Sequence, residues 1–257
     1  KFPYTEMAAM GWVPTTRKSN ERVVNLRKYF EVAQLGRLEN AELIPAIACR
    51  RLSITEKGDF ALIAWAQRAK IEARYIETTR TNLCELEKRL PEIRALTLKE
   101  PSSFCEELSD LLTNCGIAPV FLPHLSGSFL HGATFYDNGK IVMGLTLRGK
   151  DADRFWFSLF HEIGHIMLGH LTKSTGADNA DEEAADCFAK DVLIPPDEYN
   201  SFLKKSIFTR EAIIDFAASI GIAPGIIVGR LQKEGHIDFN RLNDLKVKYE
   251  LTSNADF

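Results

Sequence analysis

The chain has 257 residues, of which 45% are hydrophobic and 26% charged, with a formal net charge of −3. This composition is typical of a globular protein built from one large domain or two small ones. No apolar run approaches the roughly 20 residues of a membrane-spanning helix. The first residues also lack the basic and apolar segments of a signal peptide. The chain begins with Lys1 rather than Met, which suggests that further residues precede it.

The cysteines indicate a reducing compartment. They number five, an odd count, and no two form a CxxC pair: Cys49, Cys84, Cys105, Cys115 and Cys187. We therefore expect small buried thiols in a cytoplasmic protein, without a disulfide framework.

The first hundred residues favour helices. Apolar side chains recur with helical spacing at 20–33, 59–77 and 83–93, the first capped by Ser19 or Asn20 and the third bent or ended near Pro91. Residues 1–100 carry an excess of five positive charges and 101–257 an excess of eight negative ones. Because acidic and basic residues alternate in 1–100, we favour a solvated helical surface over a site for an acidic partner. The pattern predicts a helical N-terminal region, 1–100, that packs on the rest and contributes no metal ligand.

Residues 101–257 mix strands with helices. A helix at 104–117 with Ser102 or Ser103 as its cap precedes a strand at 118–123. A hairpin at 132–147 turns at Asn138-Gly139, a pair that favours positive φ. Helices follow from Asp151 or Asp153 through His165, at 181–194, and as a pair at 209–235. We expect a mostly helical α+β fold with a small antiparallel sheet packed on the helix that contains His165.

Residues 160–170 read FHEIGHIMLGH and carry the pattern HExxH. On a helix, His161 and His165 lie four residues apart on one face and can aim two imidazoles at one metal ion. Glu162 lies about 100° round the helix and can reach a metal-bound water without binding the ion. Zinc fits this arrangement, because catalytic zinc sites keep one position for a water. We therefore predict His161 and His165 as zinc ligands and Glu162 as the general base.

A third ligand must come from elsewhere in the chain. His170 does not match the spacing of an extended three-histidine motif, and we interpret it as a helix C-terminal residue that favours the helix dipole. Glu182 shares a helical face with Asp186 on the next helix, so we prefer it to its rival Glu183. Asp186 could then hold a ligating histidine by its second nitrogen.

Three segments together resemble the ImmA/IrrE metallopeptidase family: FWFSLFHEIGHIMLGH, EEAADCFAKDVLIPP and FAASIGIAPGIIVGRLQ. The resemblance covers about residues 102–235. It implies a gluzincin-like fold, a zinc ion held by His161, His165 and Glu182, and Glu162 as the catalytic acid/base. It also implies cleavage of a repressor or antitoxin-type regulator in bacterial stress, phage or mobile-element circuits. Residues 11–33 resemble family members that carry an XRE-type helix-turn-helix, but no such unit precedes Gly11.

A DNA-associated function is the alternative. Residues 213–231 have the spacing of a helix-turn-helix around Gly221, but their second helix offers only Arg230 and Lys233, near its end, for reading bases. We therefore interpret this pair as structural, with any DNA contact indirect or made through a missing N-terminal domain. The alternative protein is a non-proteolytic regulator with a structural zinc. If the chain is a peptidase, the 129–147 hairpin is the expected edge for a substrate strand. Candidates for a second oxyanion donor are Tyr136, Arg148, Arg154 and Tyr199.

Overall fold

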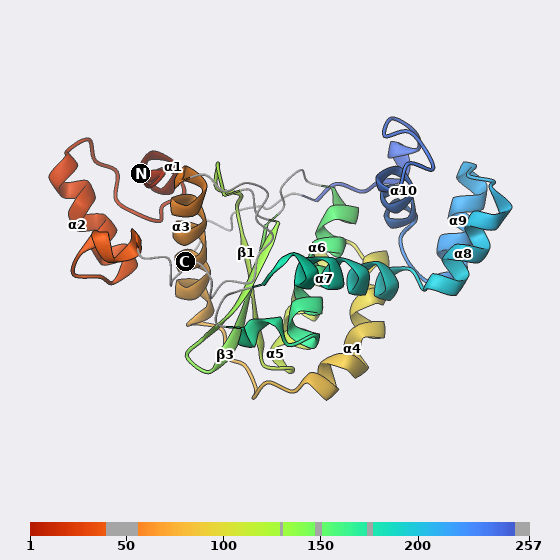
Figure 1. Ribbon diagram of the computed structural model, residues 1–257, viewed down its shortest axis with the longest axis horizontal. Coiled ribbons are helices and arrows are strands. Elements are labelled where there is room, and N and C mark those ends of the chain that lie inside the picture. The colour runs from red at the N-terminus through yellow and green to blue at the C-terminus, as the bar shows by residue number, and fades with distance from the viewer. Residues whose placement is uncertain (40–55, 129–130, 147–150, 174–176, 250–257) are drawn as a thin grey trace.

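The computed structural model describes residues 1–39, 56–128, 131–146, 151–173 and 177–249. Helices dominate, as predicted, and they surround one small sheet (Figure 1). The strands are β1 (Ile117–Leu122), β2 (Gly132–Asp137) and β3 (Lys140–Thr146). The helices before them are α1 (Tyr4–Ala9), α2 (Ser19–Phe30), α3 (Glu56–Ala73), α4 (Leu83–Ala95) and α5 (Pro101–Thr113), with 3₁₀ turns η1 (Leu35–Glu39) and η2 (Leu96–Leu98). Those after them are α6 (Ala152–Met167), α7 (Asn179–Leu193), α8 (Pro196–Lys205), α9 (Arg210–Ile220) and α10 (Pro224–Lys233), with 3₁₀ turns η3 (His170–Thr172) and η4 (Asn243–Leu245).

The sheet is mixed, so the prediction of an antiparallel sheet was wrong. Its strand order is β1-β3-β2, with β3 antiparallel to β2 and parallel to β1. The hairpin is as predicted, because Asn138 and Gly139 both adopt positive φ, at 48° and 83°. β1 and β3 are buried along almost their whole length, as is usual for strands paired in parallel and covered on both faces.

Helices cover both faces of the sheet (Figure 1). On one face lies α3, with α1 and α2 beyond it; on the other lie α5 and α6, with α4 and α7 behind them. Each face of the sheet has its own hydrophobic core, and the side chains of β3 alternate between them. Val142 lies in the core on the α3 side, and Ile141 and Met143 lie in the core on the α5 and α6 side. Gly144 allows α3 to approach closely, because a Cβ there would lie 2.5 Å from the Trp65 ring.

The described residues of 1–100 are helical and contain no strand, in line with the prediction. Contacts from this region cross residue 100, since α3 packs on β1 and β3 and α4 packs on α6 and α7. The division into 1–100 and 101–257 stays a prediction.

Pro91 does not end α4, which continues to Ala95. An internal proline costs a helix about 3 kcal/mol. Leu86 and Ile93 of the same helix are buried, and burial of each side chain contributes about 1.5–3 kcal/mol of stability. Together they offset the cost of the proline.

The helix caps agree only in part with those expected: Asp151, one of the two candidates for α6, is its N-cap, whereas the serines expected to cap α2 and α5 lie inside these helices. The N-cap residues of α2, α5 and α6 are Lys18, Glu100 and Asp151, and none of them caps its helix with a side-chain hydrogen bond. Pro101 occupies the first turn of α5, where a missing N–H costs little. The helices α1 and α8 were not predicted from the sequence.

Four described cysteines are free thiols, and Cys49 lies outside the described residues. The expectation that all are buried was wrong for Cys84, Cys105 and Cys187, which lie on exposed helix faces; Cys115 is buried. No single helix in the described ranges has the length and apolarity to cross a membrane. Among the described helices, α9 and α10 pass that test only when taken together, and they bend by 115° at their junction.

Candidate metal centre

The candidate site lies on α6, which is buried between the sheet and α7. His161, Glu162 and His165 are 5%, 2% and 0% exposed. Side chains of this polarity are rarely buried unless they find partners.

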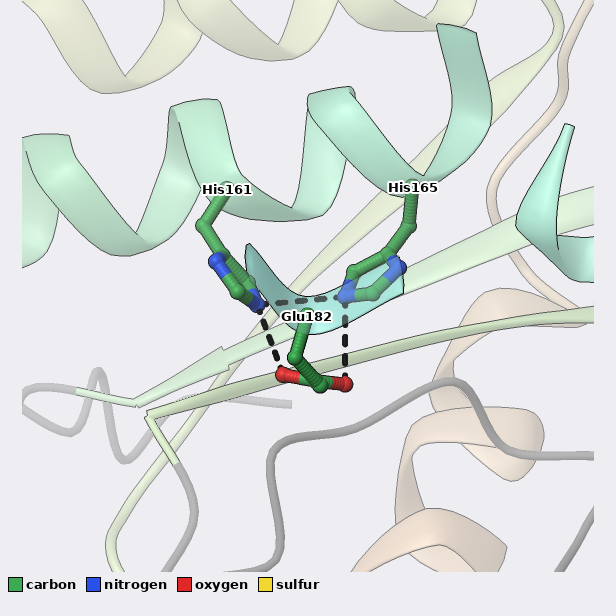
Figure 2. Close-up of side chains that lie close together, drawn as sticks. All are labelled: His161, His165 and Glu182. Carbon is green, nitrogen blue, oxygen red and sulfur yellow. Dashed lines mark hydrogen bonds and ion pairs between the residues drawn. The ribbon is translucent and has the colours of Figure 1, made fainter. Parts of the chain in front are cut away.

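A small residue lets α7 reach the site. Gly164 faces α7, and a Cβ at this position would lie 3.2 Å from the Cα of Ala185. The close helix contact brings Glu182, in the first turn of α7, opposite the two histidines (Figure 2).

Three ligand atoms converge. The Nε2 atoms of His161 and His165 lie 3.1 Å apart, and each lies 3.4 Å from an oxygen of Glu182 (Figure 2). In a tetrahedral zinc site with bonds of about 2.0–2.1 Å, ligand atoms are about 3.3–3.4 Å apart. The observed separations match, so the cluster could hold a divalent metal ion.

Glu182 gives a second indication of a metal ligand. Both carboxylate oxygens are buried, and among the described residues neither accepts a hydrogen bond. A buried carboxylate whose nearest imidazole nitrogens lie 3.4 Å away is poorly compensated, and a cation between Glu182 and the histidines would compensate it better. Glu183, the rival ligand, is exposed and lies outside the cluster.

The two histidines differ in their protonation. Burial lowers the pKa of His161, but the carboxylates of Asp186 and Glu182 raise it to about 9. Burial and the neighbouring His161 lower the pKa of His165 to about 4. At neutral pH His161 is therefore the protonated histidine of the pair and His165 the neutral one.

Each histidine has a partner at its other nitrogen. Asp186 Oδ1 lies 2.8 Å from Nδ1 of His161, which is the contact that the sequence predicted. The partner of His165 is His170, with 2.9 Å between the two Nδ1 atoms. His170 is buried in η3 rather than placed at the end of α6, so its interpretation as a residue that favours the helix dipole was wrong.

The Glu162 carboxylate lies against β2, next to Thr134 and Gly132. The Thr134 hydroxyl donates to its Oε2 at 2.5 Å. Gly132 leaves room for the carboxylate, since a Cβ there would lie 2.7 Å from Oε1. Burial raises the pKa of Glu162 to about 7, against the lowering by His161 and Thr134. A carboxylate with this pKa is suited to exchange protons at neutral pH. Neither Thr134 nor Gly132 was predicted as a residue of the site.

A cavity of about 290 Å³ reaches His161 and Glu162 from the side of α10. Its lining combines apolar and basic side chains, among them Phe157, Leu193, Ile194, Ile226, Phe239, Arg154, Lys190, Arg230, Lys233 and Lys246. Much of the charge is engaged, because Lys246 pairs with Asp153 at 3.0 Å and Arg230 with Glu234 at 3.0 Å. The cavity is therefore a largely apolar recess that can take one side chain of a bound molecule.

The proposed oxyanion donors lie in different surroundings. Arg154 lines the cavity, while Tyr136 is half exposed on β2. Tyr199 is buried and donates to Glu234 at 2.7 Å, so its hydroxyl is already engaged. Arg148 lies outside the described residues.

The helix pair α9–α10 is built into the fold. α10 packs on α6, and its side chains Ile226, Ile227 and Val228 are buried. A helix that reads DNA must present a face to the groove. The burial of α10 agrees with the interpretation of this pair as structural.

Neither the family models nor the curated proteins compared with the chain gave a match.

Proposed function

We propose that the protein is a zinc-dependent endopeptidase. The observation that carries this proposal is Glu162, a buried carboxylate beside three converging metal-ligand atoms and at the end of a cavity. A purely structural metal site would need no buried acid next to its first histidine. Zinc, when bound, would polarise a peptide carbonyl and acidify a water.

The side chains around Glu162 would determine which of its oxygens accepts and donates the proton. Thr134 holds Oε2, which leaves Oε1, the oxygen beside Gly132, to take a proton from the attacking water. Glu162 would then deliver this proton to the leaving amine nitrogen as the peptide bond breaks. The pKa of about 7 suits both steps.

An extended peptide can approach along β2. Among the described strands β2 pairs only with β3, so the described residues place no strand on its other edge. A substrate strand added there would run past Glu162, whose carboxylate lies against Gly132 and Thr134 of β2. One of its side chains would enter the cavity between α6 and α10.

The resemblance of the HEIGH and EEAADCFA segments to the ImmA/IrrE family supports the choice of substrate. We propose a helix-turn-helix repressor or an antitoxin-type regulator, cleaved in the bacterial cytoplasm. The free thiols agree with this compartment.

The Glu162→Gln variant tests the proposal. Gln is nearly isosteric but cannot accept a proton at neutral pH. We expect zinc binding to persist and cleavage of a regulator encoded nearby to fall by about 10²–10⁴-fold, the usual cost of losing a general base. The assay compares the two proteins at equal zinc occupancy.

Two results would count against the peptidase. If Glu162→Gln cleaves as fast as the wild type, Glu162 is not the base. If neither protein cleaves a regulator that both bind, the non-proteolytic regulator with a structural zinc becomes the better interpretation.

A further inference from the structure

His170 is buried, polar and not one of the three converging ligands. It is 6% exposed and follows Gly169, whose φ of 75° turns the chain back toward the site after α6. Its Nδ1 lies 2.9 Å from Nδ1 of His165, and its Nε2 lies 3.3 Å from Oδ1 of Asp181. These contacts link a metal-ligating histidine to the start of α7.

The order of donors and acceptors in this link follows from chemistry. A neutral histidine that offers Nε2 to a metal carries its proton on Nδ1. His165 must then donate from Nδ1 to Nδ1 of His170. That leaves the proton of His170 on Nε2, where it faces Asp181.

Asp181 is well placed to end this link. Its carboxylate accepts two hydrogen bonds from Lys173, at 2.6 and 2.7 Å, and one from the Asp178 backbone N–H at 3.0 Å. The last of these belongs to the capping box of α7. Asp181 is also the neighbour of Glu182, so the same side chain that faces His170 anchors the turn that presents the third ligand.

We propose that His170 is a positioning residue of the metal centre, a role that rests on the proposed zinc site. It holds His165 in the tautomer and orientation that direct Nε2 toward the ion. Through Asp181 it also fixes η3 against the first turn of α7, which carries Glu182. His161 has a direct carboxylate partner in Asp186, whereas His165 reaches its carboxylate through a second imidazole.

The test measures metal affinity rather than activity. Zinc ion is titrated against a chromophoric chelator into the wild type and into His170→Phe, which keeps a flat ring but has no polar atom. Supporting residues of this kind change metal affinity by about 10–100-fold. We expect a loss in this range for His170→Phe. His236→Phe, at an exposed histidine away from the site, should bind zinc like the wild type.

A pair of conservative variants separates positioning from packing. The Asn carbonyl can occupy the place of Nδ1 and accept from His165, whereas the Gln amide reaches the place of Nε2. We therefore expect His170→Asn to retain more zinc affinity than His170→Gln, and its visible spectrum with bound cobalt(II) to stay closer to that of the wild type. If His170→Phe fails to fold, the comparison of Asn with Gln still tests the positioning role of His170.

The outcomes distinguish this role from the proposed function. If the wild type binds no zinc, the metal centre itself is wrong. If the wild type binds zinc and His170→Phe binds it equally well, or if Asn and Gln are equivalent, the metal centre stands and the positioning role is overturned.

Discussion

Glu182 and Glu183 are neighbours in the chain but have different surroundings. Glu182 faces two imidazoles from within the protein, and Glu183 faces solvent. The pair therefore offers a matched test of the third ligand.

We expect Glu182→Gln to lose zinc affinity by more than the roughly 10–100-fold typical of a supporting residue, because an amide oxygen is a weaker ligand than a carboxylate. Glu183→Gln should bind zinc like the wild type. Chelator competition measures both. Equal affinities in the two variants would contradict the assignment of Glu182.

Thr134 acts on the proposed base rather than on the metal. Its hydroxyl donates to Glu162, and hydrogen bonds to charged groups contribute about 1.5–3 kcal/mol. We expect Thr134→Val to lower kcat by about 10- to 100-fold, the equivalent of that free energy, with zinc affinity unchanged.

The control for this prediction is Thr146→Val. Thr146 is also a buried threonine of the sheet, but its hydroxyl has no hydrogen-bond partner among the described residues. The substitution should leave kcat unchanged. The free energy of unfolding should stay the same or rise slightly, because an unpaired buried hydroxyl is removed. Similar losses of activity in both variants would show that Thr134 matters for packing alone.

Local spacing explains why part of the site could be predicted. His161, Glu162 and His165 belong to one helix, so their relative directions follow from its geometry. Glu182 required the packing of a second helix, and its shared face with Asp186 supplied a clue. Thr134 and His170 gave no such signal. Thr134 acts across 28 residues of chain, and the placement of His170 depends on the left-handed turn at Gly169.

At the scale of elements, the site depends on how closely α7 approaches α6. Gly164 permits this approach, because a side chain at this position would contact Ala185 and Phe188. We expect Gly164→Val to push α7 outward, separate Glu182 from the histidines and weaken zinc binding by about tenfold or more.

Ala180→Val serves as the control, since Ala180 lies in the first turn of α7 but is exposed. It adds similar volume without entering the helix contact and should bind zinc normally. Circular dichroism of both variants checks that the helices are intact. Wild-type zinc affinity in Gly164→Val would show that the helix contact does not set the ligand geometry.

The elements themselves followed from the sequence where their signals are local. Asn138-Gly139 specified the hairpin, and helical periodicity specified α3 and α6. The parallel pairing of β1 with β3 did not follow, because no local signal states which strand β1 joins or in which direction. That choice is made by the helices that bury both faces of the sheet.

At the scale of the whole molecule, the two cores share one sheet. Neighbouring residues of β3 point into different cores, so the unfolding of one core would expose one face of the sheet on which the other core is built. This arrangement favours a single cooperative unfolding transition, even though the sequence predicts separate regions at 1–100 and 101–257.

Zinc binding at the proposed centre would make this cooperativity measurable. An ion that binds only the folded protein at 100 times its dissociation constant adds about 2.7 kcal/mol to the free energy of unfolding. For a chain of this size that corresponds to a rise in Tm of about 5–10 °C. We expect calorimetry to show one transition that zinc moves as a whole, and no movement in the His161→Ala/His165→Ala double variant. Two transitions, with zinc moving only one, would instead show that α1–α3 unfold independently of the metal centre. The helices α1–α3 would then be a separate unit resting on the sheet rather than part of the structure that the metal stabilises.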